Sequence, residues 1–432
     1  MKRLFSLLLV ALCFAVVFAS GAPEAQSVAK SGSLEPEEGA VIEFAYWEST
    51  TSIAETWTRL IAEFEQKYPG VKVNATVYPS KGFTTQIDTR MAANDYPDVC
   101  LVQYSNVGKY KDTGLMLDVS DYFSDEDIAG YVDGFVAPFL DGDAVYGVPL
   151  HTDTIVLCYN KTMFEEQGIR IPTGKDDAYT MEELEGIGKK LKEAYGLEYA
   201  FAGVWTGTRA MRLMPFAYEL GVDIFPDNDF EKINIDTPEF KAFINLYKHW
   251  LEEGLVVAET ISQKGTSNNM LMSGLVPFNF SGSWQADNIE SGMPGNWGMT
   301  YLPSINGRLS SDLGGNGLFG ISKTKYPNAV ATFIKWLSSK EIMTSFCQDG
   351  GFIPVREDIR NEDISYSKYD EELKVVIDFA STLDPKLAVA ATSPNWSLFN
   401  TILSEEMDAL VTENASAEDV ISRILARWDE EL

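Results

Sequence analysis

The chain has 432 residues and carries 64 acidic against 34 basic side chains, which gives a net charge of −30. Nucleic acid and anionic membranes repel so acidic a protein, so neither is an expected partner. The two histidines, His151 and His249, leave little room for a multi-histidine metal site or for histidine-based catalysis. The length is about three times the ~150 residues of a typical domain, which predicts two lobes or domains.

Residues 1–19 have the pattern of a cleaved secretory signal peptide. A basic start precedes an apolar run that ends at Ala19 in a small-residue cleavage pattern. The run is shorter than the ~20 apolar residues of a membrane span, which disfavours a membrane anchor. Cys13 follows a leucine inside the apolar run, which disfavours a lipoprotein. Residues 20–40, rich in Ala, Ser, Gly, Pro and Glu, are expected to form a flexible tether.

Removing the signal leaves Cys100, Cys158 and Cys347. The first two lie in apolar, strand-like runs, so buried free thiols are expected, although one disulfide stays possible in an oxidising compartment. No CxxC pattern occurs, so the sequence gives no sign of a zinc or redox motif.

The apolar pattern predicts an α/β protein. Strand and helix patterns alternate near the start as β-α-β-α-β, which implies a parallel sheet with helical crossovers. These strands are expected at 41–47, 71–77 and 98–102, with helices at 53–68 and 83–91 between them. Later strands are expected at 144–149, 154–159 and 318–322, and helices at 181–194, 238–253, 328–337 and within 395–428.

Polar side chains follow the carboxyl ends of the first three strands, where open α/β sheets bind ligands. Segments 47–50, 78–81 and 103–106 carry aromatic and hydrogen-bonding side chains rather than a glycine-rich turn. They favour a polar, non-phosphorylated ligand. Residues 315–320 do fit the dinucleotide pattern GxGxxG, but a strand runs through them where a helix is required. A flexible segment between lobes explains these glycines better.

Glu48 and Asp153 are candidates for the paired carboxylates of a glycosidase. Isolated acids are common in a chain with 64 of them, so a ligand hydrogen bond or a solvated position is favoured for each. No other catalytic, cofactor or metal pattern is present, so we expect no enzyme activity, cofactor or metal.

Seven of the nine tryptophans fall into two groups. Three lie in amphipathic helices and are expected in the core: Trp57, Trp250 and Trp336. Four lie in loop-like contexts rich in Gly, Ser, Thr and Asn: Trp47, Trp205, Trp284 and Trp396. An aromatic plane beside amides, hydroxyls and carboxylates suits the apolar face of a neutral sugar, with domain packing as the competing interpretation for each.

An ordered series of short motifs over residues 41–432 resembles the extracellular solute-binding proteins of bacterial ABC transporters, in particular the sugar-binding group similar to maltose-binding protein. The motifs are Phe-Glu-Gln-Lys-Tyr-Pro-Gly-Val-Lys-Val at 64–73, Tyr-Pro-Asp-Val at 96–99, Val-Tyr-Gly-Val-Pro at 145–149, Met-Ser-Gly at 272–274 leading to Gly-Ser-Trp at 282–284, and Gly-Gly-Phe-Ile-Pro-Val-Arg at 350–356.

This resemblance implies two α/β lobes, joined by a multi-strand hinge, with the ligand in a central cleft. Crossings are expected near Thr152, Ser310 and Gly350, with 41–152 plus 310–350 in lobe 1 and 153–309 plus 351–432 in lobe 2. The cleft residues that carry over are Trp47, Glu48, Lys81, Gln103, Tyr104, Asp153, Trp205, Trp284, Gly315, Asn316 and Trp396. Lys81, with Arg209 and Arg356, could equally be a surface or packing cation.

The expected function is that of a monomeric periplasmic protein that closes around a carbohydrate, such as an oligosaccharide, and delivers it to the membrane permease subunits of an ABC importer. Two alternatives stay open. One is a secreted glycoside-active enzyme that uses Glu48 and Asp153, and the other is a binding protein for a peptide, a polyol or an anionic solute.

Overall fold

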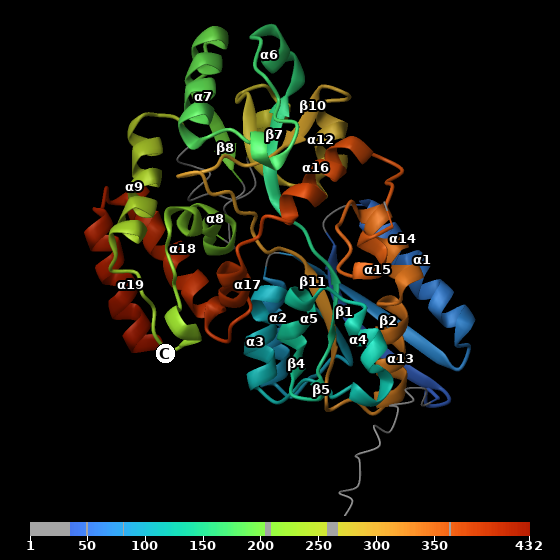
Figure 1. The fold of residues 1–432 in the computed structure, drawn as a ribbon. Coiled ribbons are helices and arrows are strands. Elements are labelled where there is room, and N and C mark those ends of the chain that lie inside the picture. Colours follow the sequence, from blue (N-terminus) through green and yellow to red (C-terminus); the bar gives the residue numbers. More distant parts are fainter. Residues whose placement is uncertain (1–34, 49–50, 81, 204–208, 257–266, 363) are drawn as a thin grey trace, which may run out of the picture.

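The computed structural model describes residues 35–48, 51–80, 82–203, 209–256, 267–362 and 364–432. Two β-sheets, each flanked by helices, lie one above the other in Figure 1, with extended segments running between them. Five strands form the first sheet and four form the second, while β4 (Leu140–Asp141) and β5 (Ala144–Val145) form a separate ribbon. This architecture confirms the two-lobe α/β fold expected from the sequence.

The first sheet contains the strand–helix–strand–helix–strand order that the apolar patterns predict. Its β1 pairs in parallel with β2 and β3, so the carboxyl ends of three strands meet at one edge. β11 then runs antiparallel between β3 and β6. The order is β2-β1-β3-β11-β6, with strands at Val71–Pro79, Ala40–Glu48, Val99–Gln103, Asn316–Gly320 and Val148–His151.

Two crossover helices, α1 (Thr51–Lys67) and α2 (Phe83–Ala92), connect the parallel strands. The buried residues of α1 follow helical spacing, so one face packs on the sheet. Trp57 is almost fully buried on this face, with its ring centroid 5.1 Å from that of Phe44 on β1. Its predicted position in the core is confirmed.

The second sheet is buried on both faces. β7 pairs antiparallel with β10 and β9, and β8 pairs parallel with β9. Every residue of these four strands is buried, which explains the nearly continuous apolar sequence of β7. The order is β10-β7-β9-β8, at Trp297–Thr300, Ile155–Asn160, Phe278–Gly282 and Phe201–Gly203.

Two chain segments that cross between the sheets lie side by side, and a third segment, at Ile353, pairs with one of them. The amide of Thr152 donates to the carbonyl of Ile353 (2.9 Å), and the amide of Ile353 donates to the carbonyl of Thr152 (3.0 Å). The hydroxyl of Thr152 also donates to the carbonyl of Gly314 (2.9 Å). The segments expected to cross near Thr152 and Ser310 therefore lie together, and the segment at Ile353 pairs with the first of them.

The third crossing differs from the expected lobe division. Beyond residue 351 the chain stays beside the first sheet, where the amide of Val132 donates to the carbonyl of Val355 (3.0 Å). The chain reaches the second sheet only with α16 (Asp370–Ala380), which packs against β10. The boundary shifts because the extended backbone near Val355 finds its hydrogen-bond partner on the first side.

The C-terminal helical segment forms two helices, α18 (Trp396–Thr412) and α19 (Ala417–Glu431). They are separated at Asn414, which has a φ of +53°, and the Ser416 hydroxyl then caps α19 by accepting from the amide of Asp419. Helix α18 packs against α19, against α3 beside the first sheet and against α8 beside the second.

The other helices and single turns cover the sheets and link them. They are α3 (Tyr104–Asp112), η1 (Ser120–Tyr122), α4 (Asp125–Ala129), α5 (Asp133–Val136), η2 (Ala137–Phe139), α6 (Lys161–Glu166), η3 (Lys175–Asp177), α7 (Met181–Tyr195), α8 (Arg209–Leu220), η4 (Pro226–Asn228), α9 (Pro238–Glu252), α11 (Ser267–Met272), η5 (Ser283–Gln285), α12 (Ala286–Gly292), α13 (Pro327–Leu337), α14 (Lys340–Gly350), α15 (Glu357–Arg360) and α17 (Pro385–Ala391).

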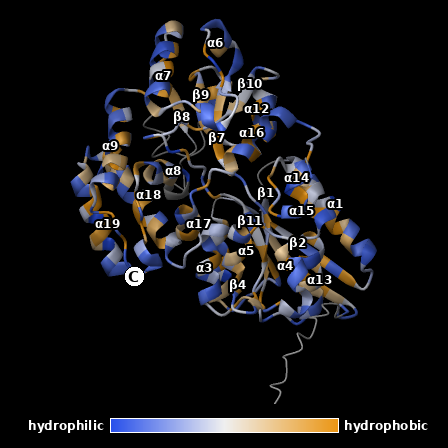
Figure 2. Cartoon of the chain, viewed as in Figure 1, coloured by the Kyte–Doolittle hydropathy of each residue, from blue (hydrophilic) through white to orange (hydrophobic). Residues whose placement is uncertain are grey.

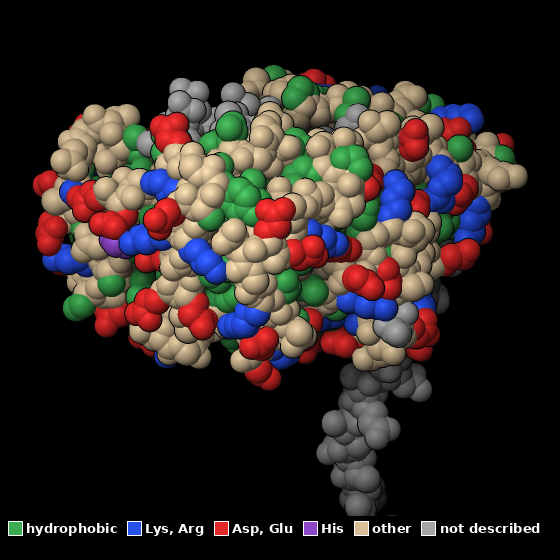
Figure 3. Space-filling model, turned by 90° about the horizontal axis from the view of Figure 1, so that it is seen from above, with side chains coloured by type: hydrophobic (Ala, Val, Ile, Leu, Met, Phe, Trp, Pro, Cys, Tyr) green, Lys and Arg blue, Asp and Glu red, His purple; other side chains and the backbone are tan. Residues whose placement is uncertain are grey.

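Apolar residues face the sheets, and hydrophilic residues lie mostly on the outer turns of the helices (Figure 2). Cys100, Cys158 and Cys347 are buried free thiols, as expected, and burial raises the pKa of each. Acidic and basic side chains are interspersed over the face seen in Figure 3. Within the described part of the chain, none of the helices combines the length and the apolar character needed to span a bilayer.

Candidate functional site

A cavity of about 410 Å³ lies between the two sides of the molecule. Helices α1 and α14 supply one wall, and η5, α12 and the start of α16 supply the other. The residues on which the site depends are Ser52, Thr56, Arg59 and Asp349 on the first wall, and Trp284, Asp287, Lys368 and Tyr369 on the second. A concave site shared between two lobes is a usual place for a small-molecule ligand.

Asp287 is the polar centre of the second wall. Its carboxylate accepts hydrogen bonds from the Ser52 hydroxyl (2.8 Å) and the Tyr369 hydroxyl (2.9 Å), and the Lys368 ammonium lies 3.2 Å away. Partial burial opposes ionisation, but these three donors hold the pKa of Asp287 below its usual value. The bond from Ser52 joins α1 to α12, so the carboxylate links the two walls.

Asp349 has the matching place on the first wall, near the end of α14. Its carboxylate accepts from a guanidinium nitrogen of Arg59 (2.6 Å) and from the hydroxyl of Thr56 (3.3 Å). Arg59 also pairs with Glu63 at 2.9 Å. The wall therefore presents hydroxyls and paired charges rather than an open cationic field, which suits a neutral polyhydroxylated molecule better than an anion.

Trp284 brings an aromatic surface to the cavity. It follows β9 within η5 and is only partly buried. Its ring folds back over Gly282, where an added Cβ would lie 2.0 Å from the indole, so a side chain there would push the ring out of this position. The guanidinium carbon of Arg212 lies 4.5 Å from a ring centroid of the indole, a cation–π distance.

Arg212, on α8, lies within a buried charge cluster at the hinge. Both terminal nitrogens lie 3.3 Å from Oδ1 of Asp153, and one also donates to Asp312. Asp312 in turn accepts from the hydroxyl of Thr154 (2.5 Å) and from the amide of Ile155 (2.8 Å). Burial lowers the pKa of Arg212, but the two carboxylates outweigh it and raise the pKa, which keeps the guanidinium charged.

The carboxylate of Asp153, expected to contact ligand, is therefore committed to Arg212 in this structure. The side chain is 7% exposed, and burial raises its pKa against the opposing effect of Arg212. Gly314 packs so closely that an added Cβ would lie 1.9 Å from Oδ1 of Asp153. In this arrangement Asp153 acts at the hinge.

Asn316, Gly315 and Gln103 meet where β11 begins. Asn316 pairs with Gln103 in the sheet, and its Nδ2 lies 2.9 Å from Nε2 of His151. An amide nitrogen only donates, so the imidazole accepts at Nε2, and burial lowers the pKa of His151 to about 3. Gly315 has a φ of +102° and would place a Cβ 2.3 Å from the carbonyl of His151. Strand β11 continues to Gly320, as the sequence predicts for the GxGxxG segment.

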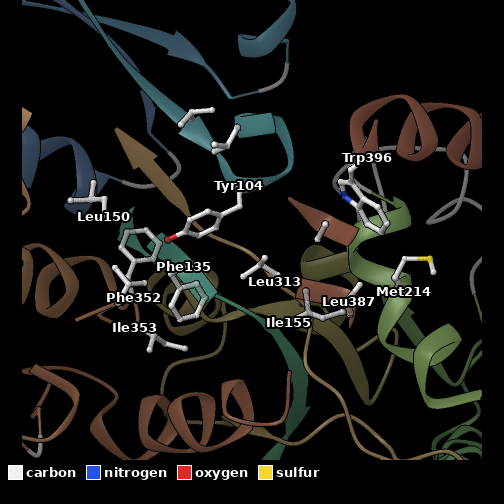
Figure 4. Close-up of a cluster of buried hydrophobic side chains, with 14 of the residues drawn as sticks. Tyr104, Phe135, Leu150, Ile155, Met214, Leu313, Phe352, Ile353, Leu387 and Trp396 are labelled. Atoms are coloured by element: carbon white, nitrogen blue, oxygen red, sulfur yellow. The ribbon is translucent and has the colours of Figure 1, made fainter. Parts of the chain in front are cut away.

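Tyr104 and Trp396 lie in the core rather than at the cavity. Figure 4 shows both in a cluster of buried hydrophobic side chains, and their exposed fractions are 1% and 0%. Each begins a helix, α3 or α18, and these helices pack tightly together. An added Cβ at Gly108 on α3 would lie 2.7 Å from the backbone nitrogen of Pro394, just before α18. This close packing explains why Trp396 fits the competing interpretation of domain packing.

Trp47 is partly buried at the carboxyl end of β1, with its ring centroid 4.7 Å from that of Phe83. Lys81 and Trp205 lie outside the described residues. Glu48 ends β1 and Arg209 begins α8, but the described features do not include their side chains. Arg356 pairs with Asp358 and lies over the ring of Tyr131, which are packing contacts.

Several site residues were not anticipated from the sequence, namely Ser52, Asp287, Lys368, Tyr369, Arg212 and Asp312. Only Arg212 carried a signal, because a lone cation in the apolar run Met-Arg-Leu-Met-Pro-Phe of α8 indicates a buried charge that needs partners. Among the described residues, no group of three His, Cys, Asp or Glu side chains is placed to hold a metal ion.

Curated relatives cover most of the chain at low identity. A putative binding protein of Brucella abortus (strain 2308) is 21% identical over 378 residues, 85% of this chain and 87% of the relative. The maltodextrin-binding protein of Bacillus subtilis is 21% identical over 399 residues, 87% of this chain and 88% of the relative.

Solved structures show the same fold. An ABC substrate-binding protein from Listeria monocytogenes, in complex with cycloalternan, has a TM-score of 0.78 at 18% identity, over 91% of this chain and 99% of its own. A maltose-bound binding protein of T. maritima has a TM-score of 0.75 at 20% identity, over 91% of this chain and 100% of its own.

The family described as bacterial extracellular solute-binding protein matches residues 47–344, more than half of the chain. Its members are binding proteins, which confirms the expectation of a non-enzymatic role over a glycosidase. The cavity shared by two lobes and the hinge that connects them agree with that description. The chain belongs to the bacterial extracellular solute-binding protein family.

Proposed function

We propose that the chain binds a carbohydrate, an oligosaccharide in particular, between its two lobes and delivers it to the membrane permease subunits of an ABC importer. The observation that carries the proposal is the cavity in which Trp284 faces a set of hydroxyls, amides and paired carboxylates from both lobes. An aromatic plane accepts the apolar face of a sugar ring, while the polar groups bond its hydroxyls.

The printed names of several relatives support the sugar class. One relative is a maltodextrin-binding protein and another an arabinooligosaccharide-binding protein, both of Bacillus subtilis. Solved structures of similar fold contain cycloalternan or maltose. Their low identity to this chain leaves the sugar, its linkage and its length to experiment.

We further propose that the protein is a periplasmic monomer, exported by residues 1–19 and released near Ser20. Closure of the lobes would present one ligand-loaded surface to the permease. Affinity for the closed state, rather than any bond-breaking step, then accounts for function.

A thermal-shift screen of the mature protein tests the ligand class. The panel holds maltose, longer maltodextrins, arabinooligosaccharides and cycloalternan, against polyols, short peptides and small anions. A ligand present at a hundred times its Kd adds about 2.7 kcal/mol to the free energy of unfolding and raises the midpoint. We expect saccharides alone to do so, and the best of them to be recovered unchanged after incubation.

Calorimetric titration of Trp284→Ala, with Trp336→Phe as its control, then locates the site. Trp336 is buried on α13 away from the cavity lining, so its replacement leaves Kd unchanged. Stabilisation by a peptide, polyol or anion instead of a sugar would move the assignment to a non-sugar solute.

A further inference from the structure

Arg212 contacts both the aromatic side chain of the cavity and the chain segments of the hinge. Its guanidinium lies 4.5 Å from a ring centroid of Trp284 and bonds Asp153 and Asp312, which belong to two different crossing segments. We infer that Arg212 is a positioning residue for ligand binding, one that sets the orientation of the Trp284 indole according to the state of the hinge. The inference rests on the proposed function, because it gives Trp284 the role of ligand platform.

The indole of Trp284 is partly buried and packs against the edge of the apolar core. It belongs to η5, a single turn of three residues after β9, and it lies over Gly282, which offers no side chain. Among the described residues, no aromatic ring stacks on it. The guanidinium of Arg212 is the cation that lies over its ring, at 4.5 Å from the centroid.

Only arginine can make these contacts together. The flat face of a guanidinium packs on an indole while the N–H groups at its edge bond carboxylates in the same plane. A lysine ammonium would pair with the carboxylates but has no such face. Arg212 is 6% exposed, so its contact with Trp284 is little screened by water.

The hinge end of this arrangement is anchored more firmly than the cavity end. Asp312 is buried and bonds the Thr154 hydroxyl (2.5 Å) and the Ile155 amide (2.8 Å), which ties the second crossing to the first. A rotation that moves one crossing against the other must move Asp312 and with it Arg212. The indole follows, so the platform and the hinge act as one unit.

A buried ion cluster that serves stability alone is the competing explanation. The two explanations differ in what happens to Trp284. Under a purely structural role, Asp312→Asn, which leaves Arg212 and its contact with the indole in place, weakens folding without changing the environment of the indole in the surviving fold. Under a positioning role, the indole changes its environment even in the absence of ligand.

Fluorine NMR of the mature protein labelled with 5-fluorotryptophan measures the environment of the Trp284 indole directly. The chain contains nine tryptophans, and Trp284→Phe identifies the signal to follow. We expect Arg212→Met and Asp312→Asn both to shift or broaden that signal. Arg212→Lys keeps the charge for the carboxylates, so it serves if the methionine variant does not fold, and it should disturb the same signal.

The matched control is Arg170→Met. Arg170 also lies over an aromatic ring, that of Tyr179 at 4.8 Å, but at an exposed position that does not line the cavity. Its replacement should leave the Trp284 signal in place. An unmoved Trp284 signal in folded Asp312→Asn protein would overturn the inference, whatever the ligand proves to be.

Affinity for the best saccharide of the screen supplies the second measurement, through a cycle of Arg212→Met, Trp284→Ala and the double variant. Loss of a buried aromatic or arginine anchor typically weakens Kd by about five- to 150-fold, and we expect both single variants in that range. In the Trp284→Ala background, Arg212→Met should add almost nothing, because its effect passes through the indole.

Losses that multiply in the double variant would overturn the inference while leaving the proposed function intact. If Trp284→Ala leaves Kd unchanged, Trp284 does not contact the ligand, and the role of Arg212 in ligand binding is ruled out as well. If no saccharide binds the parent protein, the proposed function fails, and the ligand-free NMR measurement alone decides whether Arg212 positions the indole.

Discussion

The hydroxyl of Ser52 on α1 donates a 2.8 Å hydrogen bond to the carboxylate of Asp287 on α12, and so joins the two walls of the cavity. This bond can form only while the lobes are close. Ser52→Ala removes it and should favour the open form. We expect affinity for the best saccharide to fall by about 1 kcal/mol, the lower end for a hydrogen bond to a charged, partly exposed group.

Small-angle scattering of the ligand-free protein checks the same point without ligand. The radius of gyration of Ser52→Ala should exceed that of the parent and return to the parent value at saturation. Thr58→Ala, which removes an exposed hydroxyl from the same helix, should behave as the parent does. Identical scattering from both variants and the parent would show that the bond does not hold the lobes together.

Trp284 should contribute directly to affinity. Replacement by alanine should cost on the order of 1–3 kcal/mol, a five- to 150-fold weaker Kd, as for other aromatic anchors. Trp57→Ala, in the core of the first lobe, should instead lower the free energy of unfolding and leave the Kd of the folded protein nearly unchanged. Calorimetry and urea unfolding on both variants separate these outcomes.

Trp396 should affect stability rather than binding, because its indole is fully buried beside Phe399, with ring centroids 5.6 Å apart. Trp396→Ala should cost about 3–5 kcal/mol in the free energy of unfolding, as for other buried aromatics. Titration of the folded fraction should give the parent Kd. If Trp396→Ala has the stability of the parent but a weaker Kd, Trp396 contacts the ligand and this prediction is wrong.

Stability should depend on pH through His151. Burial lowers its pKa to about 3, whereas in the unfolded chain the imidazole takes up a proton near its ordinary pKa of 6.5. Its contribution to stability is therefore complete above pH 6.5 and declines as the pH falls toward 3. At pH 5 the loss is about 2 kcal/mol, from 1.36 kcal/mol per pKa unit over roughly 1.5 units.

His151→Gln lacks this titration. Urea unfolding of the parent and the variant at pH 7.5 and pH 5.0 isolates the contribution of His151 to the free energy of unfolding, since the two proteins have all other titratable groups in common. The parent should lose about 2 kcal/mol more than the variant over this interval. Equal losses would mean that His151 is accessible to protons in the folded protein.

The mature protein should begin near Ser20, because the apolar start is short and ends in a cleavage pattern at Ala19. Intact-mass measurement of secreted protein checks the expectation. A mass that includes Met1, or a lipid at Cys13, would contradict it.

The sequence was most informative where one physical rule acts along a continuous segment. Helical spacing placed Trp57 in the core, and the apolar runs at β1 and β7 predicted strands. Every residue of β7 is buried, whereas Val41 leaves one face of β1 exposed, so the apolar run of β1 predicted the strand but not its full burial. The strand predicted at 318–322 exists, but it runs from Asn316 to Gly320, so Gly317 and Gly320 belong to a buried strand and the expected flexible segment is wrong for them. These signals are local, so a single chain contains them in full.

The cavity depends on contacts between distant residues, and the sequence contains no such distances. Asp287 and Ser52 are 235 positions apart, and each resembles an ordinary surface residue. Trp396 follows a Ser-Pro-Asn stretch that resembles a loop, but the tight packing of α3 against α18 buries it. Asp153 was expected to contact ligand, and only the structure reveals that Arg212 already occupies its carboxylate.

Helix α18 packs against α3 on one lobe and α8 on the other, and at Gly108 there is no room for even a methyl group. In Figure 1 this contact lies to the left of the crossings, whereas α1, α14 and α12 lie to the right. If the lobes separate, the rotation axis lies near this tight contact, and the largest displacement is between α1 and α12 on the opposite side. The cleft would then open on the side of Ser52 and Asp287, and a ligand would enter and leave past these two residues. A long saccharide could extend into solvent there while its inner end stays enclosed.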